Sequence, residues 1–408
     1  MFRRNAVLAA AGISVLGVLA APATAAPAKV TGAYDAGTDA VATIAQAYLV
    51  SHPDLTPAAA RAAAQAQSAG EQLKAEIAKE WKTFGGGWFD PYTATYNVAV
   101  TSATTGRTLA AVGATKGVKV NTPLVARNFD QLNAEAEALR NGTSALAKAA
   151  GGNVGIDVRT NQVVAAVPES ARRAELGQAG VSVVNGQNTS VQADACTDRA
   201  NCDDFQAAGL MLRNGAGQHW CSIGFTARNS ANQRITLTAG HCSTGIGEVW
   251  SNGTATVRTV GSVSGRIDSG VSDVTRIVST NSFYDNVNSG RIYIGAGSNT
   301  SPVKGESFFL VNDVACLSAS FTNPARSGNP CATVTNTSDA GTRGMVRIDG
   351  YDACGGDSGG GWYWLAPSGN RYAVALHSRS NSGCNVANGT SWASPLSAFY
   401  SDLVYEVS

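Results

Sequence analysis

The sequence has few charged residues and no excess of either sign. Of its 408 residues, 14% are Asp, Glu, Lys or Arg, and the formal net charge at pH 7 is +1. Proteins that bind nucleic acid or an anionic lipid surface through electrostatics usually carry a strong basic excess. The composition therefore indicates neither kind of partner, and we expect no nucleic acid and no membrane.

Long apolar runs are also missing. The stretch 6–20 is apolar and uncharged, but it is too short to span a bilayer comfortably, and no later apolar stretch reaches its length. Two arginines precede it at 3–4, and small residues follow at 23–25. This order is typical of a secretory signal peptide, here 1–25, so we expect a secreted, extracellular protein. An N-terminal membrane helix is the alternative.

Cysteine is absent from the first 195 residues and occurs eight times after them. The sequence contains no Cys-x-x-Cys pair, so it indicates no zinc cluster, and we expect no metal and no cofactor. An even cysteine count in an exported chain predicts disulfides. Order alone does not prove a pairing, but pairing in order gives Cys196–Cys202, Cys221–Cys242, Cys316–Cys331 and Cys354–Cys384.

The composition changes near residue 190. The part before it is rich in alanine and predicts helices at 58–82 and 130–140, with strands at 96–101, 109–112 and 162–167. After about residue 207 the pattern becomes strand–turn–strand, with strands expected at 220–227, 235–238, 255–263, 274–279, 307–311, 361–365 and 372–377. We therefore expect an α+β region at 26–190 and an all-β domain at 191–408, joined by a polar linker at 185–194.

Two short motifs carry the chemistry. Thr238-Ala239-Gly240-His241-Cys242 holds a histidine, and Gly356-Asp357-Ser358-Gly359-Gly360 holds a serine between glycines. A serine hydroxyl is a weak nucleophile at neutral pH, so it needs an adjacent base, and that base needs a third group to orient it. The glycines allow a tight turn in which two backbone amides point at one oxygen. Together the motifs indicate nucleophilic acyl transfer.

With these motifs the chain resembles the secreted bacterial chymotrypsin-like serine proteases of the streptogrisin and alpha-lytic protease type. The segments 86–90 and 155–164 also resemble the pro-region of that group. The resemblance implies an all-β fold of two antiparallel six-stranded barrels with the active site between them, preceded by an α+β pro-region. It further implies a zymogen, because the pro-region of this group assists folding, inhibits the enzyme and is then cleaved off.

The resemblance also assigns the catalytic residues. It makes Ser358 the nucleophile, His241 the general base and then acid, and Asp273 the orienting carboxylate, because an apolar strand follows Asp273 directly. Asp268, five residues earlier, is the alternative carboxylate. The backbone amides of Gly356 and Ser358 are expected to form the oxyanion hole.

In this group the carboxylate before the nucleophile, here Asp357, is buried and paired with a cation. Bacterial members often carry an arginine directly after the cysteine that matches Cys316, but here that residue is Leu317. An unpaired buried carboxylate is costly, so some partner is expected. Arg326, Arg343 and a new N-terminus made by cleavage are the alternatives.

Two features give opposite indications about P1, the substrate residue before the scissile bond. His377, Ser378 and Ser380 resemble the groups that bind a P1 carboxylate in glutamate-specific members. Asp352 resembles the residue that receives Arg or Lys in trypsins, although it can instead neutralise or orient His377. We expect an acidic P1, with a basic P1 through Asp352 as the alternative. An apolar P1, with His377 simply packed in a strand, is the third possibility.

The sequence thus favours a monomeric serine endopeptidase that acts on peptides and proteins and has its own pro-region as a partner. A catalytically silent homologue used for binding is a second hypothesis, but such homologues usually lose one of the three catalytic residues. A serine esterase of α/β-hydrolase fold is a third, because the letters around Ser358 match Gly-x-Ser-x-Gly. That fold, however, requires a helix after the serine and the chain order Ser, Asp, His.

Overall fold

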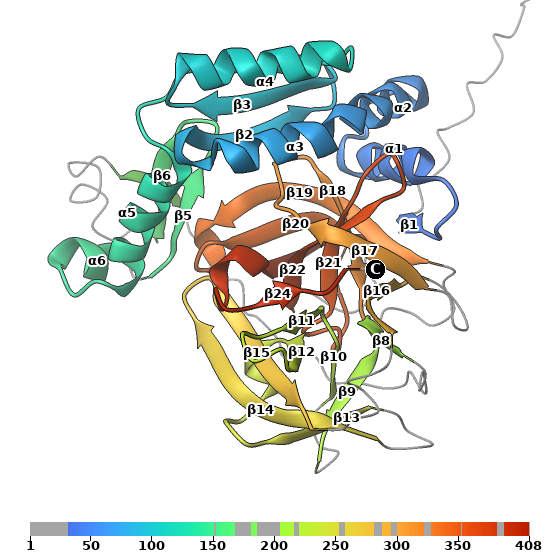
Figure 1. Cartoon of the computed structure of the whole chain (residues 1–408). Helices are drawn as coiled ribbons and strands as arrows, with labels where there is room; N and C mark the ends of the chain where they lie inside the picture. The colour runs from blue at the N-terminus through green and yellow to red at the C-terminus, as the bar shows by residue number, and fades with distance from the viewer. Residues whose placement is uncertain are drawn as a thin grey trace, which may run out of the picture. The chain divides into compact units, whose positions relative to one another are not determined.

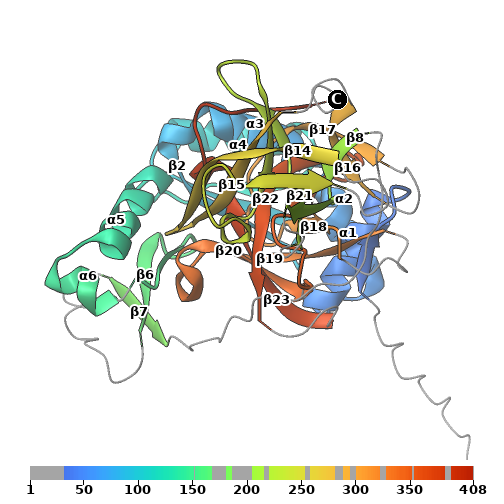
Figure 2. The same ribbon diagram turned by 90° about the horizontal axis from the view of Figure 1, so that it is seen from below.

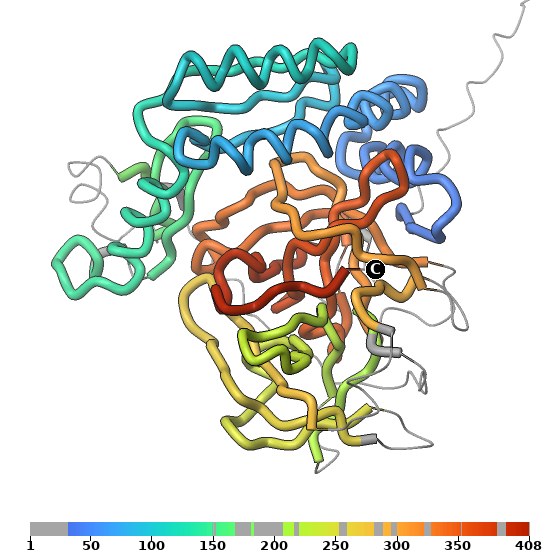
Figure 3. Tube along the Cα trace, in the orientation of Figure 1, coloured from blue at the N-terminus to red at the C-terminus, as the bar shows by residue number. Residues whose placement is uncertain are grey.

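The computed structural model describes residues 32–150, 152–167, 181–185, 205–215, 220–252, 258–280, 288–294, 300–321, 328–351, 353–381 and 387–407. Within these residues the chain is mostly β, and all of its α-helices lie before residue 151 (Figure 1). The colour of the tube in Figure 3 follows the chain from this helical part, in blue, to the last strands, in red.

The N-terminal segment, 32–185, contains all of these helices and two small sheets. The helices are α1 (Ala40–Ser51), α2 (Pro57–Ala66), α3 (Gly70–Lys79), α4 (Ala103–Thr115), α5 (Phe129–Asn141) and α6 (Ala145–Ala150), with 3₁₀ turns η1 (Gln67–Ala69) and η2 (Trp81–Thr83). One sheet joins β2 (Phe84–Asp90), β3 (Thr95–Val100) and β4 (Lys119–Asn121), and the other joins β5 (Val154–Asp157), β6 (Gln162–Val167) and β7 (Ser182–Asn185). A further strand, β1 (Ala33–Asp35), begins the segment.

Polar side chains cap the starts of these helices. The Thr56 hydroxyl accepts a hydrogen bond at the start of α2, and the Ser102 hydroxyl does the same for α4. Asn128 and Gln131 form a reciprocal capping box at α5. These helix starts are therefore encoded locally, in the residues around each cap.

Two sequence predictions for this segment are wrong. The helix expected at 58–82 is divided by η1, and at the junction a Cβ on Gly70 would lie 2.5 Å from the Tyr96 hydroxyl, so a larger residue there would require the Tyr96 side chain to shift. The strand expected at 109–112 lies inside α4. Buried residues of α4 recur every four positions, which is the period of a helix with one face on the core and not the alternation of a strand.

Six strands of the C-terminal part close into a barrel, in the order β21-β18-β19-β20-β23-β22, with β22 pairing back to β21. They are β18 (Val314–Ser318), β19 (Asn329–Asp339), β20 (Met345–Tyr351), β21 (Gly361–Leu365), β22 (Arg371–Ser380) and β23 (Ala387–Pro395). The sheet continues from β22 through β17 (Thr300–Glu306) and β16 (Asn288–Tyr293) to β8 (Phe205–Ala208). Trp362 and Trp364 lie fully buried in its core.

A second antiparallel sheet runs in the order β10-β9-β13-β14-β15-β12-β11-β24 and curls into a half-barrel (Figure 2). Its strands are β9 (Met211–Asn214), β10 (Trp220–Ser222), β11 (Thr226–Arg228), β12 (Arg234–Thr238), β13 (Val249–Asn252), β14 (Arg258–Ser269), β15 (Ser272–Ser279) and β24 (Val404–Tyr405). Register shifts in the pairings of β13 and β15 with β14 bend the sheet around buried Trp250. Three 3₁₀ turns complete the two sheets: η3 (Gly240–Cys242), η4 (Ala340–Thr342) and η5 (Leu396–Ala398).

The expected fold class, two antiparallel barrels preceded by an α+β segment, is confirmed, with one barrel closed and the other a curled half-barrel. The strand expected at 307–311 is not present; only Val311 forms an isolated bridge, to Trp88. The boundary expected near residue 190 lies outside the described residues. Among the described residues, no helix is both long and apolar enough to cross a membrane.

The N-terminal segment shares buried charges with the closed barrel. Strand β1 pairs antiparallel with β19, and the guanidinium of Arg371 donates to both carboxylate oxygens of Asp35 at 2.7 and 2.8 Å. Lys74 of α3 forms a second ion pair, 2.6 Å long, with Asp313, and both side chains are buried. Removing one partner of such a pair leaves an uncompensated charge in a low-dielectric site, so these contacts tie the segment to the barrel.

Candidate active site

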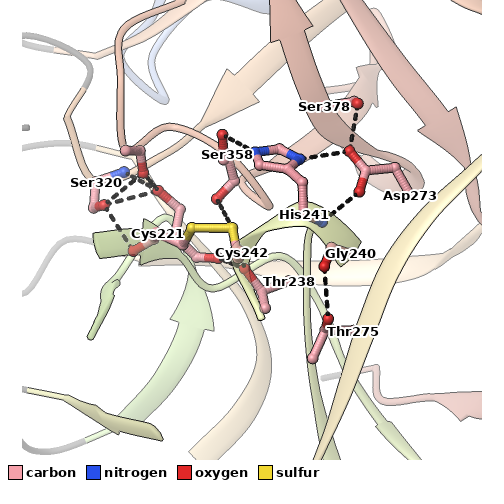
Figure 4. The surroundings of a disulfide bond; sticks show 12 residues. Cys221, Thr238, Gly240, His241, Cys242, Asp273, Thr275, Ser320, Ser358 and Ser378 are labelled. Atoms are coloured by element: carbon pink, nitrogen blue, oxygen red, sulfur yellow. Dashed lines mark hydrogen bonds and ion pairs between the residues drawn. A yellow bond between two sulfur atoms is a disulfide. The ribbon is translucent and has the colours of Figure 1, made fainter. Parts of the chain in front are cut away.

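Three side chains from separate elements meet in one hydrogen-bonded row (Figure 4). His241 lies on η3, Asp273 on β15 and Ser358 in the turn between β20 and β21. The imidazole Nδ1 of His241 lies 2.8 Å from Asp273 Oδ2, and its Nε2 lies 2.8 Å from Ser358 Oγ. The row has the geometry of a serine hydroxyl, a base in reach of it and a carboxylate that orients the base.

Backbone contacts set the position of His241. Its amide donates to Asp273 Oδ1 at 2.8 Å, so the carboxylate holds both the main chain and the ring. A Cβ on Gly240 would lie only 2.1 Å from the carbonyl oxygen of Ile267. Glycine at this position therefore lets η3 pack against β14 and β15 closely enough for the imidazole to reach the carboxylate.

Asp273 is fully buried and ionised. Burial by itself raises the pKa of this carboxyl group, but hydrogen bonds from His241 and Ser378 outweigh burial and lower the pKa to about 2. The carboxylate therefore keeps its charge at neutral pH and can stabilise a protonated imidazole. Asp268, the alternative in the sequence, instead forms ion pairs with Arg266 and Arg343.

The turn that carries Ser358 depends on glycine. Gly356 and Gly359 have φ values of +84° and +85°, a region that glycine adopts far more readily than other residues. A Cβ on Gly359 would also lie 2.1 Å from Thr238 Oγ1. Within the part of the chain that the structure describes, the amides of Gly356 and Ser358 donate to no protein acceptor, which leaves them able to bind an oxyanion.

A pair of buried hydroxyl groups supports this turn, and the sequence analysis missed it. Ser222 Oγ donates to the Gly356 carbonyl oxygen at 2.7 Å, and the Ser222 amide donates to the Ser358 carbonyl oxygen at 2.8 Å. Ser320 holds Ser222 in turn, through its amide at 2.8 Å and its hydroxyl at 2.7 Å. One feature of the sequence points to this role, the position of Ser222 directly after Cys221. Ser222 and Ser320 are 98 residues apart, so no local pattern predicts their contact.

The structure also gives Asp357 two partners that the sequence did not indicate. Its carboxylate accepts hydrogen bonds from the amides of Phe321 and Cys354, each at 2.8 Å. Peptide N–H groups satisfy a buried carboxylate much as a cation would, though with partial charges. Of the expected partners, Arg343 pairs with Asp268 instead, and Arg326 lies outside the described residues.

Of the residues expected to bind P1, Asp352 lies outside the described residues, and His377 is only 1% exposed. Its Nδ1 accepts a hydrogen bond from Trp362 Nε1 at 3.3 Å. Burial, with a smaller contribution from the nearby His241, lowers the pKa of His377 to about 3, so the ring is neutral at pH 7. A neutral imidazole can donate one hydrogen bond to a substrate but brings no positive charge.

The two serines expected at P1 have partners within the protein. Ser378 Oγ donates to Asp273 Oδ2 at 2.5 Å, and Ser380 Oγ donates to the Ala353 carbonyl oxygen at 3.1 Å. Both side chains are buried. Ser378 thus holds the triad carboxylate in place, which differs from the substrate-binding role expected for it, because its strand β22 passes directly beside β15.

Two of the four expected disulfides are present, Cys221–Cys242 and Cys316–Cys331. Cys354 is also disulfide-bonded. The residues Cys196, Cys202 and Cys384 lie outside the described part of the chain. The first disulfide anchors the turn that contains His241 to β10. Among the described residues, no group of three or more His, Cys, Asp or Glu side chains is placed to hold a metal ion.

No protein-family model and no curated protein matches this chain. The structure is similar to a protease from Nocardiopsis, NAPase, with 21% identity and a TM-score of 0.38 over 49% of this chain and 98% of that one. Protease A from Thermobifida fusca is 24% identical, with a TM-score of 0.38 over 50% and 98% of the two chains. Chymotrypsin from Cellulomonas bogoriensis is 25% identical, with a TM-score of 0.37 over 50% and 98%.

Proposed function

We propose that this chain is the precursor of a serine endopeptidase that cleaves peptide bonds through an acyl-enzyme. The observation that carries the proposal is the position of His241, whose two ring nitrogens each lie 2.8 Å from their partners, Asp273 and Ser358. A base that reaches a serine hydroxyl on one side and a buried, ionised carboxylate on the other is the arrangement that activates serine for attack on a carbonyl.

The reaction follows from these positions. Ser358 Oγ bonds to the scissile carbonyl carbon while His241 Nε2 takes the hydroxyl proton, and Asp273 stabilises the imidazolium that forms. The amides of Gly356 and Ser358 donate to the oxyanion of the tetrahedral intermediate. His241 then gives its proton to the leaving amine, and a water molecule, deprotonated by the same nitrogen, releases the acid product and restores Ser358.

The fold disfavours the esterase of the α/β-hydrolase class. Strand β21, not a helix, follows Ser358, and the chain order is His241, Asp273, Ser358. The row of hydrogen bonds disfavours the silent binding homologue, because a protein selected only for binding has no need to keep all three groups in contact.

A fluorophosphonate probe and casein test the proposal together. The purified protein, produced from the full chain, should be labelled on Ser358 and should degrade casein. Labelling without casein hydrolysis would favour an esterase. The absence of both, with Ser358→Ala indistinguishable from the parent, would support the binding homologue and overturn the proposal.

We further propose that 26–190 is a pro-region, removed to leave 191–408, and that 1–25 directs a secreted protein. The buried pairs Lys74–Asp313 and Asp35–Arg371 support a partner that folds together with the barrel. The disulfides support an oxidising, extracellular location. N-terminal sequencing of the secreted protein should find a start near residue 191 for the parent and at residue 26 for Ser358→Ala. An identical start for both would exclude self-cleavage.

Loss of the Ser222 hydroxyl should slow the chemistry without weakening substrate binding. In Ser222→Ala the Gly356 carbonyl loses a buried donor, so the turn that presents the oxyanion amides becomes less well held. We expect kcat to fall about tenfold, with KM nearly unchanged. Steady-state kinetics on a chromogenic peptide measure this. Ser264→Ala, which removes an exposed serine hydroxyl on β14, is the matched control, and an equal kcat for both variants would contradict the role of Ser222.

The P1 preference can be tested by comparing peptides that differ only at P1. An acidic P1 would now rest mainly on the neutral His377, because Ser378 and Ser380 donate to protein groups, whereas a basic P1 would rest on Asp352. Peptides that differ only in P1, Glu or Arg, should be cleaved at kcat/KM values that differ at least about tenfold. If Glu is preferred, His377→Ala should remove the preference; if Arg is preferred, Asp352→Asn should do so.

A further inference from the structure

Three arginines gather beside the His241–Asp273 pair, and the chemistry proposed above uses none of them. Arg266 on β14 donates through Nε to the Gly240 carbonyl oxygen at 2.7 Å, and its Nη2 lies 3.2 Å from Asp268 Oδ2. Arg343 Nη2 lies 3.5 Å from the other oxygen of that carboxylate. Arg379 follows Ser378 in β22 and donates to the Ser378 hydroxyl at 3.2 Å.

The cluster carries more positive than negative charge. Among the described residues, the charged groups that act on Arg379 are Arg343, which lowers its pKa as burial does, and Asp273 and Asp268, which raise it. Guanidinium groups stay protonated at all physiological pH values. Asp273 faces His241, and Asp268 is the surface carboxylate that pairs with Arg266 and Arg343 among the described residues. With Asp268 and Asp273 both ionised, the three arginines leave a net charge of +1 for an anion that reaches the cluster.

Arg343 combines an unfavourable backbone conformation with an N–H donor that has no partner among the described residues. It has φ +60° at the end of η4, a left-handed conformation that is unfavourable for a residue with a side chain. Its Nε is buried and has no hydrogen-bond partner among the described residues. Its side chain is nevertheless 30% exposed, close to the 27% of Asp268. Because the Nε itself is buried, an incoming acceptor would meet the exposed part of this side chain.

The neighbouring strand offers a place for a peptide to bind. The pairing of β22 with β21 ends at Leu376, whereas its pairing with β23 continues to Ser380. His377 still bonds to Gly359 and Gly360 on this side, so among the described residues the edge on which an extended peptide can add as a strand lies beside Ser378 and Arg379. Arg379 directly follows Ser378, which contacts Asp273 beside His241, so such a peptide brings residues near the scissile bond past Arg379.

We propose that Arg343 and Arg379, supported by Arg266, form a subsite that binds the carboxylate of an acidic substrate residue near the scissile bond, other than P1. The proposal rests on the proposed peptidase function and specifies its substrate class. A carboxylate would receive charge-assisted hydrogen bonds from two guanidinium groups, while Asp268 weakens the attraction and keeps the empty cluster from being strongly cationic.

Matched peptides test the subsite. Each pair carries Glu or Gln at one position from P4 to P3′ and is otherwise identical, and kcat/KM is measured with the processed enzyme made from the full chain. We expect one position, not P1, at which Glu is preferred about five- to tenfold over Gln, and we expect this preference to fall as salt is raised from about 0.05 M to 1 M. A Glu/Gln ratio near one at every position would overturn the proposal.

Variants that remove a positive charge and a variant that removes a negative charge distinguish recognition of the substrate carboxylate from a purely structural role of these residues. Arg343→Gln should reduce the Glu/Gln ratio to near one, and Arg379→Lys should reduce it in part, whereas Asp268→Asn should raise it two- to threefold. Arg347→Gln, an arginine that pairs with Asp349 instead, is the matched control and should leave the ratio unchanged. If Arg343→Gln and Asp268→Asn change the ratio in the same direction, or not at all, the proposal fails.

The rate of Ser358 labelling by a fluorophosphonate, which carries no acidic side chain, reports whether each variant is folded. If no protein is labelled and no peptide is cleaved, the proposed function itself fails.

Discussion

Replacing Ser358 with alanine should lower kcat on a peptide substrate by about 10⁵–10⁶-fold, the largest effect expected for any single residue in this chain. The hydroxyl is the atom that bonds to the substrate, and no neighbouring group can replace it. The oxyanion amides and the substrate contacts remain, so a residual rate of about 10³–10⁴ over the uncatalysed reaction is expected. Initial rates on a fluorogenic peptide measure the loss, at enzyme concentrations high enough to detect the residual activity.

The interpretation of this loss needs a control for folding. Among the described residues, Ser358 Oγ makes its hydrogen bond to His241 only, so alanine leaves the buried network of the turn in place, and the thermal midpoint should change little. Ser368→Ala, at an exposed turn serine, should keep full activity. If Ser358→Ala retained more than about one hundredth of the parent rate, the serine could not be the nucleophile, since removing a nucleophile costs far more than that.

The second large effect concerns stability. Lys74→Met should lower the free energy of unfolding by about 3–5 kcal/mol, because Asp313 would be left fully buried without its cation. Burial already lowers the pKa of Lys74 and raises that of Asp313, so each group depends on the other to remain charged. Lys74 also lies over the Trp364 ring, 3.9 Å from its centroid, and that contact would be lost as well. Urea denaturation of the full chain with Ser358→Ala, which prevents self-digestion, measures the change.

The same helix supplies the control. Lys79 pairs with Glu76 near the end of α3 and is 69% exposed, so Lys79→Met should change stability by less than about 0.5 kcal/mol. The double variant Lys74→Met with Asp313→Leu should recover most of the loss, since it removes both buried charges. A loss no larger for Lys74→Met than for Lys79→Met would show that the ion pair does not join the N-terminal segment to the barrel.

Local chemistry explains which features the sequence predicted well. Thr56 caps a helix through an atom within three residues of it, and the glycines around Ser358 are required by positive φ angles in a single turn. Such requirements depend on near neighbours in the chain. The strand wrongly expected at 109–112 shows the limit of such local prediction. A short apolar run is compatible with the period of a helix or of a strand, and only packing against the rest of the protein decides between them.

Contacts between distant residues explain what the sequence could not predict. Ser378 reaches Asp273 across 105 residues, and Ser222 reaches the Gly356 carbonyl oxygen across 134. Sheet register and barrel closure decide which residues meet, and neither leaves a mark in the sequence near those residues. For the same reason the backbone donors of Asp357 were not foreseen.

The sequence by itself thus determined that the C-terminal part is mostly β and where the histidine and serine motifs lie, because each depends on short-range geometry or on a repeated pattern of apolar residues, whereas the two-barrel fold followed from the resemblance. The tertiary structure placed the expected Asp273, and not its alternative Asp268, against His241, and it alone showed that Ser378 supports this carboxylate and that three arginines gather beside it. The physical reason is that a carboxylate's role depends on what surrounds it. Asp273 is buried among hydrogen-bond donors and holds the imidazole, whereas Asp268 is partly exposed and pairs with arginines.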